Sequence, residues 1–344
     1  MNQRRIRVVQ WGLGAMGRSM AQLMLDKEGI ELVGAVDALP EYDGKDLGDV
    51  LGTAPVGVPV TADPDQVLPG ADVVVIATTS WVEKQLPDLL RILSAGVNVV
   101  SIAEEMAAPE AQHPEVAARL DAVAKEHGVS LVGVGVNPGF VLDLLIATLT
   151  AGSQQVTRIE ASRVNDLSPY GQTVLSTQGV GTTPEQFAAG VADGSIVGHV
   201  GFPESVRLIS DALGLGVDRV EQKVEPIISK VRREVRDLVV EPGQVAGCNH
   251  TAIGYRGEDE VVVLHHPQQV HPEAEGQSTG DYITIFGVPE IHLSTGPEIA
   301  GGIATAGMAV NTVPRIFAAT PGLKRVIDLP VPTALMGGSA YERR

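Results

Sequence analysis

The chain has 344 residues, 44% hydrophobic and 19% charged, a balance typical of folded proteins with room for two domains. Its formal net charge of −17 argues against nucleic-acid binding and is typical of an acidic surface, which could also steer cationic substrates. The single cysteine, Cys248, excludes an internal disulfide and favours a reducing compartment. We expect a cytoplasmic protein, because neither a signal peptide nor an apolar run of membrane-spanning length is evident.

A glycine-rich segment between two predicted strands is the most informative motif of the chain. An apolar-periodic helix follows this segment, and the second strand ends at Asp37, twenty residues after Gly17. This order is that of a dinucleotide-binding unit, in which Gly12 allows a tight turn, Gly14 lets a pyrophosphate approach and Gly17 allows close packing. The N–H groups at the start of the helix would bind the pyrophosphate. We therefore expect NAD or NADP to contact Gly12, Leu13, Gly14, Ala15, Met16, Gly17 and Asp37.

Short apolar segments alternate with amphipathic segments over the first 140 residues. This alternation predicts a doubly wound parallel sheet with helices on its faces. The predicted strands are 6–11, 31–36, 58–61, 71–77, 97–101 and 129–134. The predicted helices are 16–27, 83–95 and 114–127.

Beyond residue 140 the pattern changes to longer stretches of alternating apolar and polar residues, which predict antiparallel strands with one wet face. These strands are 157–164, 217–228, 245–255, 260–265, 281–286 and 291–294, and the predicted helices are 140–150, 184–192, 204–213 and 299–319. We expect an α/β protein. Its N-terminal Rossmann domain would comprise residues 1–140, with 299–344 returning to pack on it. A second α+β domain, residues 141–298, would contain a mostly antiparallel sheet.

Loops that follow the parallel strands are the candidate site, because ligands bind outside the carboxyl ends of such strands. Glu104 and Glu105 leave an apolar strand together and should point in different directions, one into the cleft and the other to solvent. A carboxylate in a partly buried cleft can bind an ammonium group or act as a general acid or base. The alternative is that both are solvated loop acids. The other loop residues expected near the cofactor are Thr78, Thr79, Ser80 and Asn137.

Three further residues could form a pocket or belong to ordinary structure. Phe140 ends an Asn-Pro-Gly-Phe turn and would be either a pocket wall or core. Tyr170 and His199 lie in predicted loops rich in glycine and proline, where a hydrogen-bonding role competes with a structural one. The histidines of the chain lack the spacing of a zinc site, so we predict no metal.

These residues together are similar to the 2,4-diaminopentanoate dehydrogenases and the related native amine dehydrogenases, which have a dihydrodipicolinate-reductase-like architecture. The resemblance covers nearly the whole chain and rests on residues 9–17, 34–37, 77–80, 102–105, 135–140 and 199–205. It implies an NAD(P)-dependent oxidoreductase that acts on C–N bonds. One direction is the reductive amination of a ketone or aldehyde with ammonia, and the other is oxidative deamination of an amine.

The resemblance also implies roles for individual residues. Glu104 would bind ammonia or the substrate amine and assist proton transfer. An iminium ion is positively charged, and a carboxylate beside it would stabilise that charge. The second-domain sheet would form a homodimer. The pocket for the ketone, aldehyde or amine would be lined by Phe140, Tyr170, His199, Thr305 and Met308, with Ala304 nearby.

Several alternatives remain open from the sequence. A diaminopentanoate substrate needs a cation for its carboxylate, for which Arg163, Arg207 and Arg256 are available; without one in the pocket, a plain ketone or aldehyde is favoured. Asp37 favours NAD, whereas Arg18 and the resemblance allow NADP, so we expect both to be used. A dihydrodipicolinate reductase would need a basic signature that the sequence lacks after its paired histidines. A non-catalytic protein would bind NAD(P) without turnover.

Overall fold

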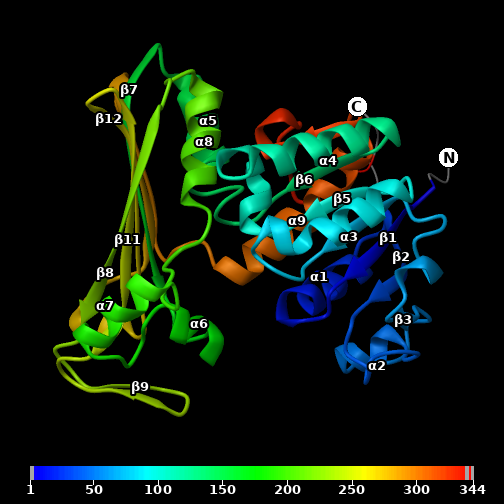
Figure 1. Cartoon of the computed structure of the whole chain (residues 1–344), viewed down its shortest axis with the longest axis horizontal. Coiled ribbons are helices and arrows are strands. Elements are labelled where there is room, and N and C mark those ends of the chain that lie inside the picture. The colour runs from blue at the N-terminus through cyan, green and yellow to red at the C-terminus, as the bar shows by residue number, and fades with distance from the viewer. Residues whose placement is uncertain (1–3, 338–340, 342–344) are drawn as a thin grey trace. The chain divides into compact units, whose positions relative to one another are not determined.

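A computed structural model describes residues 4–337 and 341 of the chain. It divides into two compact units (Figure 1). Unit 1 comprises residues 1–140 and 300–344, and unit 2 comprises residues 141–299. No helix among the described residues combines the length and the apolar character needed to cross a bilayer.

Unit 1 contains a seven-stranded sheet in the order β15-β6-β5-β4-β1-β2-β3, and every neighbouring pair is parallel. The order of its first six strands is that of the doubly wound dinucleotide-binding fold, so the predicted class is confirmed. The strands are β1 (Ile6–Trp11), β2 (Ile30–Val36), β3 (Val60–Thr61), β4 (Val73–Ile76), β5 (Asn98–Ser101), β6 (Ser130–Gly133) and β15 (Gly322–Lys324).

Helices cover both faces of this sheet. Val9 and Trp11 of β1 belong to the core under α3 and α4, whereas Gln10 between them lies against α1, which packs beside α9. The helices are α1 (Ala15–Leu25), α2 (Leu47–Leu51), α3 (Val82–Ser94), α4 (Pro114–Glu126) and α9 (Gly301–Phe317). Short 3₁₀ turns are η1 (Pro64–Gln66), η2 (Glu104–Ala107), η3 (Pro109–Ala111) and η6 (Val326–Asp328). The short elements α2 and β15 were not predicted, because each has too few residues to show a repeating apolar pattern.

Unit 2 contains a six-stranded sheet in the order β14-β13-β7-β12-β11-β8. Neighbouring strands are antiparallel except for β7 and β12, which run parallel and correct the expectation of antiparallel strands at that one pair. The strands are β7 (Gln155–Asp166), β8 (Arg219–Ile228), β11 (Val245–Arg256), β12 (Asp259–Gln269), β13 (Gly280–Val288) and β14 (Ile291–Thr295). A separate hairpin, β9 (Arg233–Val235) and β10 (Leu238–Val240), was not predicted.

One face of the sheet of unit 2 is covered by helix α8, which packs on β11 and β12. Side chains of β7 alternate accordingly, with Ile159, Ala161 and Arg163 buried and their neighbours partly exposed. The helices are α5 (Leu144–Leu149), α6 (Gln172–Thr177), α7 (Pro184–Asp193) and α8 (Phe202–Leu213), with 3₁₀ turns η4 (Thr150–Gly152) and η5 (Pro272–Glu275). The expected helix at 140–150 begins at Leu144, where the Asp143 side chain accepts the Leu144 N–H.

Candidate active site

The glycine loop after β1 requires glycine at two positions. Gly12 has φ +90°, and a Cβ there would collide with the carbonyl group of Ala77. A Cβ at Gly17 would collide with the Gly12 carbonyl, because the first turn of α1 packs directly on the loop. The collision at Gly12 links the loop to the residue after β4, so the two strand ends lie against each other.

Gly14 differs from its neighbours, since a Cβ there would meet no atom within 4 Å. It is the N-cap residue of α1 and offers no side-chain cap to the first amide groups of that helix. Asp37, directly after β2, accepts hydrogen bonds from the N–H of Leu13 at 2.6 Å and of Leu39 at 2.9 Å. Open space at Gly14 beside uncapped amides, with an acid at the end of β2, fits the pyrophosphate and ribose of a dinucleotide.

The loop after β4 is tied to helix α3. The Thr78 Oγ1 accepts a hydrogen bond from the Gln85 Nε2 at 3.2 Å, and the Thr79 Oγ1 accepts one from the Trp81 N–H at 3.3 Å. Trp81 is the N-cap residue of α3. Ser80 hydrogen-bonds to the carboxyl group of Glu104. The polar residues of this loop and the acidic residue that follows β5 therefore form one local group at the carboxyl edge of the sheet.

Glu104 begins η2 and is half-buried. Burial raises the pKa of its carboxyl group, and the negative charge of Glu105 raises it further, against a lowering by hydrogen bonds from Ser80 and from its own backbone N–H. A carboxyl group with a raised pKa is suited to exchanging protons near neutral pH.

Glu105 does not face solvent, which corrects the expectation for this acidic pair. Its side chain is buried, and its Oε2 accepts a hydrogen bond from the Val82 N–H at 2.8 Å. Val82 is in the first turn of α3, where unpaired N–H groups and the helix dipole attract a carboxylate. The sequence did not reveal this partner, which lies 23 residues away.

The loop after β6 and the start of α9 carry the remaining predicted residues of unit 1. Thr305 Oγ1 accepts a hydrogen bond from the Val136 N–H at 3.1 Å, which fastens α9 to this loop. Asn137 is buried in the loop, Phe140 at its end is half-buried, and Met308 is buried one turn beyond Thr305. The structure thus places the predicted residues of unit 1 after β1, β2, β4, β5 and β6, and on α9.

The predicted residues of unit 2 lie in a polar cluster that we define as Arg163, Asn165, Tyr170, His199 and His266. The His199 ring lies 4.7 Å from that of His266 between centroids and 4.9 Å from that of Phe202. Burial, with smaller effects of the His250 and Arg163 charges, lowers the pKa of His199 to about 3. Burial likewise raises the pKa of Tyr170, against a lowering by the charge of Arg163.

Sequence reasoning missed His266 and Asn165, and left Arg163 as one of three candidate cations. The parallel pairing of β7 with β12 puts His266 next to Arg163, and the antiparallel pairing of β11 with β12 puts His250 next to His266. Both ring nitrogens of His266 and the Asn165 Oδ1 are buried with no hydrogen-bond partner among the described residues. The alternating pattern of β7 indicates that Arg163 and Asn165 share one face of the sheet. The register with β12, which brings His266 to them, was not deducible from the sequence.

The three candidate arginines have different surroundings. Arg163 is buried, and its Nη1 is 2.7 Å from the Asp281 Oδ1. Arg207 is on the surface, 2.7 Å from Asp211 on the same helix, and Arg256 is also exposed. Arg163 is therefore the one of the three that belongs to the polar cluster.

The buried histidines predict acid sensitivity of unit 2. Burial holds the pKa of His266 well below its ordinary value of 6.5 and lowers that of His250 to about 4. Below about pH 6.5 the unfolded chain therefore binds protons that the folded chain excludes, and stability falls as the pH falls.

The His266→Phe variant loses no hydrogen bond among the described residues. We expect its free energy of unfolding to fall less steeply than that of the wild type between about pH 7 and pH 5. The two slopes should differ by at most about 1.4 kcal/mol per pH unit. Urea unfolding at several pH values measures this. The exposed His292 provides the control, because His292→Phe should keep the wild-type pH dependence. If the free energies of unfolding of the wild type and of both variants fall equally steeply with pH, His266 does not cause the acid sensitivity.

A second group of possible ligands in unit 2 was not apparent in the sequence. One donor atom each from Asp166, His271 and Glu273 lies within 4.8 Å of the others. These atoms already share hydrogen bonds: the His271 Nδ1 is 3.1 Å from Glu273, and its Nε2 is 2.9 Å from the Glu234 carbonyl oxygen. Asp166 and Glu273 also line a hollow of about 620 Å³ in unit 2.

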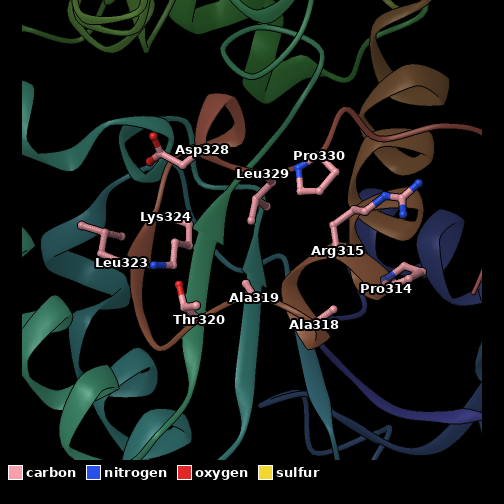
Figure 2. A pocket seen from close by; sticks show the side chains of 10 residues that line it. All are labelled: Pro314, Arg315, Ala318, Ala319, Thr320, Leu323, Lys324, Asp328, Leu329 and Pro330. Atoms are coloured by element: carbon pink, nitrogen blue, oxygen red, sulfur yellow. The ribbon is translucent and has the colours of Figure 1, made fainter. Parts of the chain in front are cut away.

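A hollow of about 210 Å³ in unit 1 lies at the other end of α9 from Thr305 (Figure 2). In Figure 2 the charged ends of Arg315, Lys324 and Asp328 point to different sides of it. It therefore lacks a convergent set of polar groups of the kind that binds a small molecule. Its lining residues are Pro314, Arg315, Ala318, Ala319, Thr320, Leu323, Lys324, Asp328, Leu329 and Pro330.

Comparison with known proteins identifies the family. The family model of the 2,4-diaminopentanoate dehydrogenase C-terminal domain matches residues 140–344, and that of the dihydrodipicolinate reductase N-terminus matches residues 6–103. The chain is 42% identical to the 2,4-diaminopentanoate dehydrogenase of Acetoanaerobium sticklandii, over 97% of this chain and 96% of that protein. The chain belongs to the 2,4-diaminopentanoate dehydrogenase family.

Amine dehydrogenases are more distant relatives of this member of the 2,4-diaminopentanoate dehydrogenase family. An amine dehydrogenase of Streptomyces virginiae is 26% identical, over 96% of this chain and 98% of that protein. The solved structure of an amine dehydrogenase from Mycobacterium smegmatis superimposes with a TM-score of 0.83 at 30% identity, covering 95% of this chain and 97% of that one. The expected family, fold class, oxidoreductase activity and NAD or NADP cofactor are thereby confirmed.

Proposed function

We propose that this dehydrogenase interconverts amines with ketones or aldehydes and ammonia, with Glu104 as the residue that binds the nitrogen. The position of Glu104 carries the proposal: it is a half-buried carboxyl group with a raised pKa beside the polar loop that follows β4. The relatives named as amine dehydrogenases support the same chemistry.

NADH or NADPH, when bound, supplies the hydride that reduces the carbon–nitrogen double bond. The residues proposed to hold its pyrophosphate and ribose are those of the glycine loop, Gly12 to Gly17, together with Asp37. Thr78, Thr79, Ser80 and Asn137 are proposed to lie near its nicotinamide, because they follow β4 and β6.

The chemistry assigned to Glu104 is charge stabilisation and proton transfer. When ammonia adds to a carbonyl carbon, the nitrogen must lose a proton and the departing oxygen must gain protons before water leaves. An ionised carboxyl group that binds ammonium can take one proton, which frees ammonia to add, and pass that proton to the oxygen; it then moves a second proton from the nitrogen to the same oxygen, which leaves as water. Once ionised, it stabilises the positive iminium ion that remains. In the reverse direction the same carboxylate binds the substrate ammonium group.

A diamino acid such as 2,4-diaminopentanoate is a second candidate substrate, and the polar cluster favours it. Arg163, which is buried in unit 2 and paired with Asp281, is the cation that we propose for the substrate carboxylate. The ring nitrogens of His266 and the Asn165 Oδ1 need hydrogen-bond partners, which a carboxylate and a second amino group can provide. An alkyl ketone would leave these buried atoms unpaired. The 42% identity to a 2,4-diaminopentanoate dehydrogenase supports this choice.

The remaining assignments belong to the same proposal. Phe140, Tyr170, His199, Thr305 and Met308 are inferred to line the substrate pocket. We propose a homodimer through the sheet face of unit 2 opposite α8, where Tyr282 is 42% exposed, and the molar mass in solution measures this. A cytoplasmic location is proposed from the single, buried cysteine.

The test is a turnover assay in both directions. Small ketones and aldehydes are supplied with NADH or NADPH, with and without ammonium. In the other direction, 2,4-diaminopentanoate is supplied with the oxidised cofactors. We expect turnover with both cofactors, ammonium-dependent oxidation of NAD(P)H, and a larger kcat/KM for the diamino acid than for its monoamine analogues. Oxidation without ammonium would indicate a carbonyl reductase instead. If no substrate is turned over, cofactor binding is the only part of the proposal that remains.

A further inference from the structure

Glu105, the residue next to Glu104, occupies an unusual place for a carboxylate. Its side chain is 4% exposed, and its Oε2 accepts the hydrogen bond from the Val82 N–H of α3. The Glu105 N–H donates to the Ser80 carbonyl oxygen at 3.3 Å. Glu105 is thus held at both its backbone and its side chain, beside the serine that hydrogen-bonds to Glu104.

One titratable side chain contacts the carboxylate of Glu105. The His113 Nε2 lies 3.4 Å from the Glu105 Oε2, and the His113 Nδ1 lies 3.8 Å from Glu83 in the first turn of α3. The charged groups around this point are therefore Glu83 from α3, His113 from the N-cap of α4 and the two acids of η2. The Glu105 carboxylate therefore contacts both the His113 ring and the first-turn N–H of α3.

A second link fixes the same segment to α3. Gln85 and Ser101 are fully buried, and the Ser101 Oγ donates to the Gln85 Oε1 at 2.6 Å. Ser101 in turn accepts the N–H of Ala103, the residue before Glu104, at 3.1 Å. The backbone before Glu104 is linked to Gln85 of α3 through Ser101, and the Glu105 side chain bonds to Val82 of α3, so the chain is held on both sides of Glu104.

We propose that Glu105 is a positioning residue that holds a buried negative charge beside Glu104 and thereby tunes proton exchange at Glu104, and that His113 and the N-terminus of α3 balance this charge. Two neighbouring carboxyl groups disfavour each other's ionisation, so the fixed charge of one sets the proton affinity of the other. This inference depends on the proposed role of Glu104 and adds a second residue that tunes the reaction.

The experiment is the pH dependence of kcat/KM for reductive amination, measured for the wild type and for Glu105→Gln. Glutamine keeps an oxygen that can accept the Val82 N–H but removes the charge. Glu104 should then ionise at lower pH, so the acidic limb of the profile moves to lower pH and kcat/KM on that limb rises roughly threefold. Ionisation of ammonium is the same for every variant, so it cancels in the comparison.

His113→Gln provides a second variant with the opposite sign, which also covers the case that Glu105→Gln does not fold. It removes the group that offsets the charge of Glu105, so the acidic limb should move to higher pH. Glu126→Gln is the control, since it removes a negative charge from the exposed C-terminal end of α4, at the other end of that helix from His113. Its profile should equal that of the wild type, and all variants should bind NADH with wild-type affinity.

Two results separate the inference from the function on which it depends. If Glu104→Gln abolishes turnover but the profiles of Glu105→Gln and His113→Gln match the wild type, Glu105 has only a structural role and the inference fails. If Glu104→Gln retains full turnover, the proposed role of Glu104 fails first.

Discussion

Replacement of Glu104 by alanine is expected to lower kcat/KM about 10²- to 10⁴-fold in both directions of the reaction, the range expected for loss of a proton-transfer group or of charge stabilisation. The reason lies in the environment of the carboxyl group, whose pKa is raised by burial and by Glu105. The neighbouring acid, Glu105, has its carboxylate bonded to the Val82 N–H of α3 and therefore does not replace Glu104.

The measurement is steady-state turnover of ketone with ammonium and of the amine with oxidised cofactor. NADH binding followed by fluorescence shows whether the cofactor site is intact, and it should be unchanged. Glu115→Ala provides a matched control, because Glu115 lies exposed in the first turn of α4. Turnover of Glu104→Ala within threefold of the wild type would remove Glu104 from the mechanism.

Replacement of Asp281 by alanine is expected to destabilise the protein by about 3–5 kcal/mol, because it leaves the charge of Arg163 buried and unpaired. Asp281 is fully buried, and its carboxylate accepts hydrogen bonds from the Arg163 Nη1 at 2.7 Å, the Ile299 N–H at 2.8 Å and the Thr295 hydroxyl at 3.1 Å. Loss of the carboxylate would leave these three donors without this acceptor in the interior of unit 2.

Urea unfolding followed by circular dichroism measures this loss. Asp259→Ala is the control, because Asp259 forms an exposed pair with Arg256 at 3.8 Å and such pairs contribute about 0–1 kcal/mol. If the Asp281 and Asp259 variants unfold at the same urea concentration, the buried pair does not stabilise unit 2.

The part of the site that depends on short spacing was predictable from the sequence. The turn at Gly12, the packing at Gly17 and the acid at Asp37 are set by residues within one strand-helix-strand unit, and local sterics restrict their arrangement. The longer strands and helices of unit 1 were predictable for the same reason, since each has its own apolar pattern, whereas α2 and β15 are too short to show one.

What the sequence did not reveal depends on partners far apart in the chain. Glu105 was expected at the surface because its partner, the first turn of α3, becomes visible only when the strand ends are brought together. His266 joined Arg163 only through the parallel pairing of β7 with β12, and a shift of that register by one residue would point His266 to the opposite face. The short helix α2 has too few residues for any period to emerge.

Both tryptophans of the chain, Trp11 at the end of β1 and Trp81 at the start of α3, belong to unit 1. Intrinsic fluorescence is therefore an internal probe of the nucleotide-binding unit, while circular dichroism records the helices and strands of both units. Comparing the two signals in one urea titration measures the cooperativity between the units without any added label. Coincident midpoints would mean that the units unfold as one, and separate midpoints would give each unit its own stability.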